Sequence, residues 1–166
     1  MIKTLINEYE LYSKKNKKFK LIRAVWCYYT YLNFRVVFLI RLMQNTKFNF
    51  FKRLIQKKLK LKYSVDVGIN TIIGKAFWVE HFMGIVLGDG VRIGDNCTVY
   101  HGVTIGQKNG KYPCLGDNVT VYPDVQILGD VRIGNNTIIS SNATVLKSTN
   151  DNSFIVGSMA FEKRRD

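Results

Sequence analysis

Two histidines, His81 and His101, are the clearest candidates for acid–base chemistry in this 166-residue chain. The imidazole of histidine ordinarily titrates near neutral pH, so it can accept and return a proton under working conditions. The three cysteines, Cys27, Cys97 and Cys114, are far apart and form no C-x-x-C pair, which predicts unpaired thiols in a reducing cytoplasm. A metal-dependent hydratase that binds its metal through three histidines would need a different ligand set, because this chain has only two histidines. We expect no metal.

An imperfect six-residue repeat must position these side chains. Val, Ile or Leu fills thirteen sites that are mostly six residues apart, and glycine directly follows seven of them. The sites are Val67, Ile73, Val79, Leu87, Ile93, Val99, Ile105, Leu115, Val121, Ile127, Ile133, Ile139 and Val145. Each hexad can supply one short strand and one turn, and three hexads close a coil of about eighteen residues. The repeat therefore predicts a mainly β protein, a parallel β-helix, over residues 63–166.

Two interruptions break the six-residue spacing. The step from Val79 to Leu87 is eight residues long and contains His81. The step from Ile105 to Leu115 is ten residues long and adds a loop. Insertions into a repeat fold become loops, often on the binding face. We therefore expect His81 to be functional, whereas His101 is either part of a cleft or a packed or solvated corner residue.

The stretch 79–88 (VEHFMGIVLG), together with the repeat, resembles the hexapeptide-repeat acyltransferases, and within them the serine acetyltransferase branch. The resemblance covers about residues 63–162. It implies a left-handed parallel β-helix that assembles as a homotrimer with active sites between subunits. It also implies transfer of an acetyl group from acetyl-CoA to a hydroxyl group. The branch includes serine O-acetyltransferases and related enzymes that acetylate sugars of bacterial surface polysaccharides.

The resemblance also implies a catalytic pair. The family has a catalytic histidine at the position of His81 and an aspartate fifteen residues earlier, where this chain has Asp66. An alcohol is a poor nucleophile near neutral pH, so the histidine would act as general base. The aspartate would fix the histidine tautomer and stabilise the imidazolium. We expect the two residues on neighbouring coils near one edge; a structural histidine and a turn or cap aspartate are the alternatives.

By the same resemblance, acetyl-CoA would bind along the outside of the coils. The matching positions are Gly106, Gln107, Pro123, Ser141, Lys163 and Arg164. The segment 156–160 (VGSMA) resembles the closing motif of the family, with Val156 and Met159 replacing the usual Ala and Pro. The two basic residues after it would bind the nucleotide phosphates, unless they form a solvated tail.

Differences from the serine enzymes bear on the acceptor. Tyr112 precedes a proline where those enzymes have a substrate-holding histidine, and Glu80 replaces the aspartate before the catalytic histidine. The inserted loop and the N-terminal segment are also shorter. With His101 as a further residue of the cleft, these changes predict a sugar hydroxyl of a bacterial surface polysaccharide or its precursor. Serine O-acetyltransferase of cysteine biosynthesis is the alternative, and a non-catalytic trimeric scaffold is the alternative of another class.

Residues 1–62 form a basic, aromatic-rich segment with sixteen Lys or Arg and two acids, a net charge of +14 against −1 for 63–166. We expect helices over 21–43 and 48–62. In the first range the longest uncharged run, 24–34, is shorter than the roughly twenty apolar residues of a spanning helix. In the second, Phe51, Leu54, Ile55 and Leu59 have helical spacing with Lys and Arg elsewhere around the helix, which predicts an apolar face. The segment predicts docking on an anionic membrane surface or packing within the oligomer. We recognise no nucleic-acid-binding module and expect a cytoplasmic protein, at the inner face of the membrane in the first case.

Overall fold

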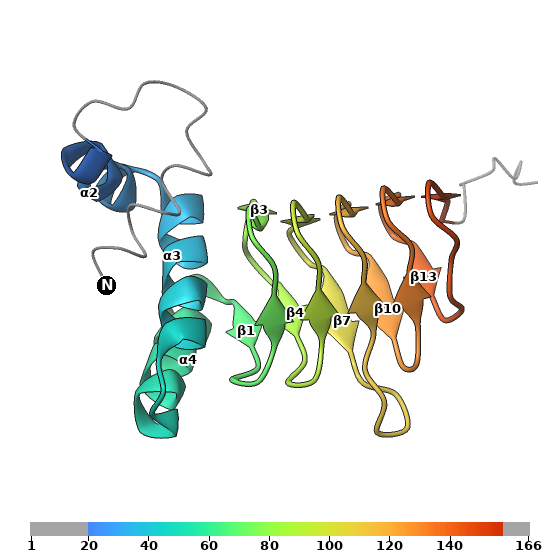
Figure 1. The fold of residues 1–166 in the computed structure, drawn as a ribbon, viewed down its shortest axis with the longest axis horizontal. Helices are drawn as coiled ribbons and strands as arrows, with labels where there is room; N and C mark the ends of the chain where they lie inside the picture. The colour runs from blue at the N-terminus through green and yellow to red at the C-terminus, as the bar shows by residue number, and fades with distance from the viewer. Residues whose placement is uncertain (1–19, 158–166) are drawn as a thin grey trace, which may run out of the picture.

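The computed structural model describes residues 20–157, which form three α-helices followed by fourteen short β-strands. The helices are α2 (Lys20–Thr30), α3 (Leu32–Asn45) and α4 (Asn49–Tyr63). They cover one end of a long stack of strands (Figure 1). No helix in this part of the chain combines the length and the apolar character needed to cross a bilayer.

The strands form three parallel sheets, in which each strand pairs with the one three places later in the chain, except that β12 pairs with β14 at the end of the stack. Sheet A contains β1 (Asp66–Val67), β4 (Val86–Leu87), β7 (Thr104–Gly106), β10 (Gln126–Leu128) and β13 (Thr144–Val145). Sheet B contains β2 (Ile72–Ile73), β5 (Arg92–Ile93), β8 (Cys114–Leu115) and β11 (Arg132–Ile133). Sheet C contains β3 (Trp78–Glu80), β6 (Thr98–Tyr100), β9 (Thr120–Val121), β12 (Ile138–Ile139) and β14 (Phe154–Ile155). The predicted fold, a left-handed parallel β-helix with an N-terminal helical segment, is confirmed.

The core of the β-helix consists of the thirteen repeat sites. All of them are at most 6% exposed. In sheet A the register stacks Val67 on Leu87 and Ile105 on Ile127, so the same type of side chain recurs on the axis coil after coil. Burying these side chains is the main favourable contribution to the fold.

The interruptions are also where the sequence predicts them. Asp66 pairs with Val86, twenty residues later, because the first coil contains two extra residues. Arg92 pairs with Cys114, twenty-two residues later, and the longer loop after β7 projects beyond the coils (Figure 1). Between them, Val86 pairs with Thr104 after the regular eighteen residues.

Contacts from α3 and α4 close the first coil of the β-helix. The buried guanidinium of Arg41 donates hydrogen bonds to the carbonyls of Ile73, at 2.7 Å, and Gly74. On α4, Leu59 and Tyr63 are buried against the same coil. Arg41 therefore satisfies carbonyl groups at the end of the stack that no further coil covers.

The apolar face expected for α4 divides into two. Among the residues expected on it, Leu59 is buried and Ile55 is half-buried, whereas Phe51 and Leu54 are exposed. The buried side also includes Gln56, which donates to the carbonyl of Val67 at 3.0 Å. Residues three and four apart share a helix face, so the face of 52, 56, 59 and 63 is directed to the β-helix. Phe51 and Leu54 belong to the opposite face.

Candidate active site

His81 lies at the corner where sheet C passes to sheet A, directly after β3. Its side chain is exposed, and its backbone φ of 50° is in the left-handed region. Non-glycine residues rarely adopt this region. The regular corner has its own residue of positive φ, at Gly84 in this coil and at Gly102 in the next. His81 therefore belongs to an additional turn made by the two extra residues.

His101 lies at the same corner of the next coil. The rings of His81 and His101 form an edge-to-face pair with centroids 5.9 Å apart and planes at 73°. His101 is half-buried, and its buried Nδ1 has no hydrogen-bond partner within residues 20–157. The structure thus brings the two candidate histidines together, with His81 exposed and His101 supporting it from the neighbouring coil.

Asp66 does not contact His81 through a hydrogen bond. Its carboxylate instead accepts one from Nζ of Lys60, on α4, at 2.7 Å. The side chain of His81 makes no hydrogen bond to any described residue, and its ring contacts that of His101. The two residues are still near one edge, because the corner after His81 stacks on the residues just before Asp66, where the Gly84 N–H donates to the Ser64 carbonyl at 2.9 Å. The orientation of His81 by Asp66 stays a prediction.

Glu80 is held from two sides. Its Oε1 accepts a hydrogen bond from Trp78 Nε1 at 2.9 Å, and its Oε2 accepts one from Asn33 Nδ2, on α3, at 3.2 Å. The carboxylate beside His81 is therefore fixed jointly by the β-helix and the helical layer. Nothing in the sequence pattern around Asn33 indicates this role, because the contact joins residues 47 positions apart.

The residues expected to flank acetyl-CoA lie along both edges of sheet A. Pro123 and Ser141 occupy the corner of His101 on the next two coils, where the Asn142 N–H donates to the Pro123 carbonyl at 3.0 Å. At the other edge, Gly106 ends β7, and the side chain of Gln107 accepts a hydrogen bond from the Gly110 N–H at 2.7 Å. Lys163 and Arg164 lie outside the described residues.

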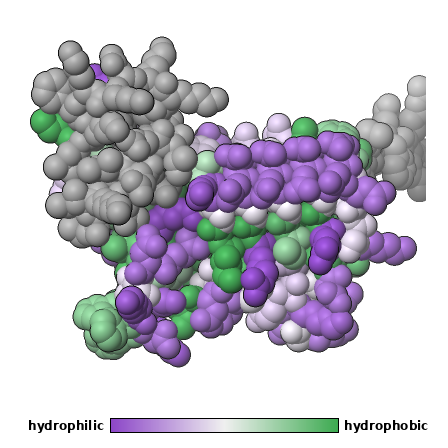
Figure 2. All heavy atoms as spheres, in the orientation of Figure 1, coloured by the Kyte–Doolittle hydropathy of each residue, from purple (hydrophilic) through white to green (hydrophobic). Residues whose placement is uncertain are grey.

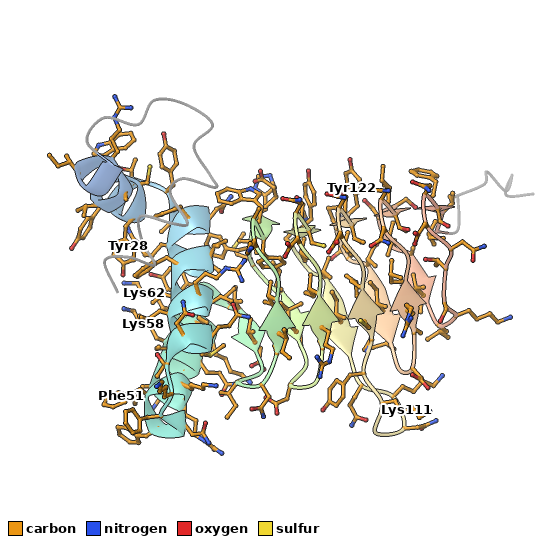
Figure 3. The ribbon with its side chains drawn as sticks, viewed as in Figure 1. Tyr28, Phe51, Lys58, Lys62, Lys111 and Tyr122 are labelled. Atoms are coloured by element: carbon orange, nitrogen blue, oxygen red, sulfur yellow. The ribbon has the colours of Figure 1, made fainter. Side chains whose placement is uncertain are left out.

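Tyr112 belongs to the inserted loop and packs down onto the coil. Its ring lies against Gly88 and Gly90: a Cβ at Gly90 would come within 2.4 Å of the Tyr112 ring. The loop is tied to the following coil by an ion pair between Lys111, labelled in Figure 3, and Asp130 at 2.6 Å. Tyr112 thus packs on the corner that follows sheet A, whereas His81 occupies the corner that precedes it.

Two features of this region have no counterpart in the sequence prediction. A cleft of about 350 Å³ separates α4 from sheet A, and Asp66, Val86 and Arg53 line it. Beside His101, the rings of Tyr100 and Tyr122 stack with centroids 5.0 Å apart. The stack follows from the β-helix register, because each coil places these tyrosines at equivalent positions.

The remaining chemistry-bearing side chains add little to the site. Within residues 20–157 there is no group of three or more His, Cys, Asp or Glu side chains placed to hold a metal ion. The three cysteines are free thiols. Burial raises the pKa of Cys97 to about 11, which leaves this thiol protonated and unreactive near neutral pH.

Comparison with known proteins agrees with this geometry. Residues 115–147 match the family model described as bacterial transferase hexapeptide (six repeats). The serine acetyltransferase of Staphylococcus xylosus is 35% identical over 109 residues, which cover 63% of this chain and 50% of that protein. The serine acetyltransferase of Staphylococcus aureus strain N315 is 36% identical over 97 residues, covering 56% of this chain and 46% of that protein. This chain contains hexapeptide repeats and is similar to serine acetyltransferases over part of its length.

Solved structures of such proteins share its fold. Serine acetyltransferase isoform 3 of Entamoeba histolytica, in complex with cysteine, superposes with a TM-score of 0.79 at 21% identity. The match covers 99% of this chain and 60% of that one. The Neisseria gonorrhoeae serine acetyltransferase in complex with serine gives a TM-score of 0.76 at 23% identity, covering 96% of this chain and 67% of that one. This hexapeptide-repeat chain spans about half the length of the curated relatives it matches.

Proposed function

We propose that this hexapeptide-repeat chain is an acetyl-CoA-dependent O-acetyltransferase with His81 as its general base. The observation that carries the proposal is the exposed imidazole of His81, held in an added turn against His101. A β-helix used only as a scaffold has no need for a two-residue insertion that presents a histidine to solvent. The relationship to serine acetyltransferases supports the same activity.

In the proposed reaction, His81 takes the proton of the acceptor hydroxyl while that oxygen attacks the thioester carbonyl carbon. A C–O bond forms, the C–S bond breaks, and the imidazolium returns the proton to the leaving thiolate. Backbone N–H groups of the glycine-rich corners are the available donors for the oxyanion. Asp66 would stabilise the imidazolium, sharing its carboxylate between His81 and Lys60.

For acetyl-CoA, the proposal uses both edges of sheet A. Gly106 and Gln107 would flank the pantetheine at one edge, and Pro123 and Ser141 at the other. The basic tail 163–164 would bind the phosphates. The outer surface of sheet A between these edges includes the exposed side chain of Val86, and a homotrimer would cover this surface with a second subunit. The sites would then lie between subunits.

Serine is the acceptor that the comparisons favour, as in the alternative given by the sequence. Its support is the naming of the two staphylococcal relatives for this substrate and a solved neighbour in complex with serine. The relatives named above do not support the polysaccharide acceptor that the sequence differences predict. One structural observation supports a sugar hydroxyl as the acceptor. Tyr112 packs on Gly90, and the carboxylate of Glu80 accepts hydrogen bonds from Trp78 and Asn33. Neither side chain is free to replace the serine-binding group that the resemblance expects there.

Thiol release from acetyl-CoA tests both parts of the proposal. Wild-type protein, His81→Asn and the control Lys147→Ala, on a distant exposed position, are assayed with L-serine and with common bacterial sugars. We expect serine-dependent release, about 10²–10⁴-fold lower in His81→Asn and unchanged in the control. Equal rates of thiol release in wild type and His81→Asn would overturn the proposed enzymatic activity. Greater stimulation of release by a sugar than by serine would identify the sugar, not serine, as the acceptor.

A further inference from the structure

Three phenylalanines form an exposed cluster at the start of α4. The rings of Phe48 and Phe51 have centroids 6.3 Å apart, and those of Phe50 and Phe51 are 5.5 Å apart. Their side chains are 69%, 53% and 68% exposed in the order Phe48, Phe51 and Phe50. A contiguous group of exposed aromatic rings is typical of an interaction site rather than of a free surface. We call these residues the Phe cluster.

The apolar surface continues along the outer face of α4. Leu54 and Leu61 are exposed and follow Phe51 at three and ten residues, on the face opposite to the buried Leu59. Lys58, between them, is exposed on the same face. In Figure 3, Phe51, Lys58 and Lys62 all project from the side of α4 that faces away from the β-helix. This face therefore contributes nothing to holding the helical layer on the first coil.

Basic side chains surround the Phe cluster. Residues 20–63 contain eleven Lys or Arg and no Asp or Glu. Those on and next to α4 are Lys47, Lys52, Arg53, Lys57, Lys58, Lys60 and Lys62. Among them, within the described part of the chain, only Lys60 forms an ion pair, with Asp66. Figure 2 shows the hydrophobic group at the corner of the molecule with hydrophilic surface beside it. Such a surface attracts an anionic partner.

We propose that the Phe cluster and the basic residues of α4 dock the protein on an anionic lipid bilayer. Aromatic rings on a helix enter the interface between headgroups and acyl chains, while lysines bind anionic headgroups. A second copy of this chain, binding through the same face, is a less favourable partner, because two surfaces with basic and no acidic residues would repel each other. Nucleic acid would neutralise the charge but leave the Phe cluster in water. A lipid surface accounts for both features.

The position of the cluster suits this role. The helical layer forms one end of the elongated molecule, and the β-helix extends from it in the other direction (Figure 1). A bilayer in contact with Phe51 would leave the corner of His81 accessible, because that corner belongs to sheet C and sheet A beyond the helical layer. Docking therefore does not depend on the proposed reaction, and each can fail without the other.

Cosedimentation of the full chain with vesicles tests the docking surface. Phosphatidylcholine vesicles with and without phosphatidylglycerol are compared for wild type, the double variant Phe50→Ser/Phe51→Ser, the double variant Lys57→Ser/Lys58→Ser and the control Phe154→Ser. Phe154 is 65% exposed at the far end of the β-helix, so it matches the cluster in type and exposure. We expect binding that requires phosphatidylglycerol, at least ten-fold weaker in the phenylalanine variant and about five-fold weaker per lysine removed. The control should bind as wild type.

Quenching of tryptophan fluorescence by brominated lipids reports insertion next to α2, where Trp26 is 56% exposed. Binding that does not require phosphatidylglycerol, or that persists in the phenylalanine variant, would overturn the proposal. An unchanged vesicle affinity together with a lower mass of the phenylalanine variant in analytical ultracentrifugation would assign the cluster to a contact between copies instead. All the substituted side chains are exposed, so we expect every variant to fold. Circular dichroism of each variant checks that a loss of vesicle binding is not caused by unfolding.

Discussion

The helical layer, residues 20–63, and the β-helix, residues 66–157, differ in the charge and in the exposed apolar side chains of their surfaces. The helical layer has eleven basic and no acidic residues, whereas the β-helix has six basic and eight acidic ones. Of the nineteen large apolar side chains that are exposed within residues 20–157, eleven belong to 22–61. The β-helix buries its apolar residues within one chain, while the helical layer leaves a second apolar face open. The difference indicates that the two regions have different partners.

They also differ in how they are held together. In the β-helix, equivalent positions on successive coils make the same contact: Asn118 donates to Asn136, and Asn136 to Asn152, each at 2.9 Å through the side-chain amides. The helical layer depends on contacts that occur once, such as that of Arg41 with the Ile73 carbonyl. Loss of one coil contact leaves its equivalents in place, but the helical layer has no such redundancy.

Substitutions of buried side chains in the two regions should have the largest effect on stability. Ile127 and Leu59 are both fully buried, so Ile127→Ala and Leu59→Ala should each lower the free energy of unfolding by about 2–5 kcal/mol. Phe51→Ala removes a larger side chain from an exposed position and should cost about 0.5 kcal/mol or less. Urea denaturation followed by circular dichroism measures all three. A cost for Phe51→Ala equal to that for Leu59→Ala would show that the Phe cluster is part of a folded contact.

Removal of the Arg41 guanidinium should have an intermediate effect at the boundary between the two regions. Arg41→Met keeps the length of the side chain but removes the charged donor of the Ile73 and Gly74 carbonyls, and leaves Ile73 only the longer hydrogen bond from Gln44 Nε2 at 3.3 Å. We expect a loss of about 1.5–3 kcal/mol in the free energy of unfolding, the usual range for a hydrogen bond to a charged group. Arg35→Met is the matched control, because Arg35 also donates to two carbonyls, those of Tyr28 and Tyr29, at a more exposed place. An equal or larger loss in the control would contradict the role of Arg41 in closing the β-helix.

The same contrast explains what the sequence could predict. The β-helix has thirteen repeat sites, and each is filled by a buried aliphatic side chain. The pattern therefore specifies both the fold and the place of each interruption. His81 was identifiable because it lies in one of those interruptions. The helical spacing of Phe51, Leu54, Ile55 and Leu59 was also correct, but helical periodicity cannot tell which of two apolar faces is covered.

The parts of the site that the sequence could not supply are the contacts from the helical layer. Asn33 reaches Glu80, and Lys60 reaches Asp66, through tertiary packing of helices that lack a repeat. The expected pairing of Asp66 with His81 came from the family resemblance, and the spacing of fifteen residues along the coil places the two near one edge without determining their side-chain partners. Lys60 competes for that carboxylate because α4 ends beside β1.

The ion pair between Lys60 and Asp66 should contribute less to stability than the Arg41 hydrogen bonds, because both side chains are accessible to water, at 62% and 35%. Lys60→Met should lower the free energy of unfolding by less than about 1 kcal/mol. The loss should shrink further in high salt, which screens exposed charges. Lys58→Met, on the outer face of the same helix, is the control and should cost less still. A larger loss that salt does not reduce would mean that the pair is buried in the assembled protein. In that case the helical layer would hold Asp66 firmly, and the carboxylate would not be available to His81.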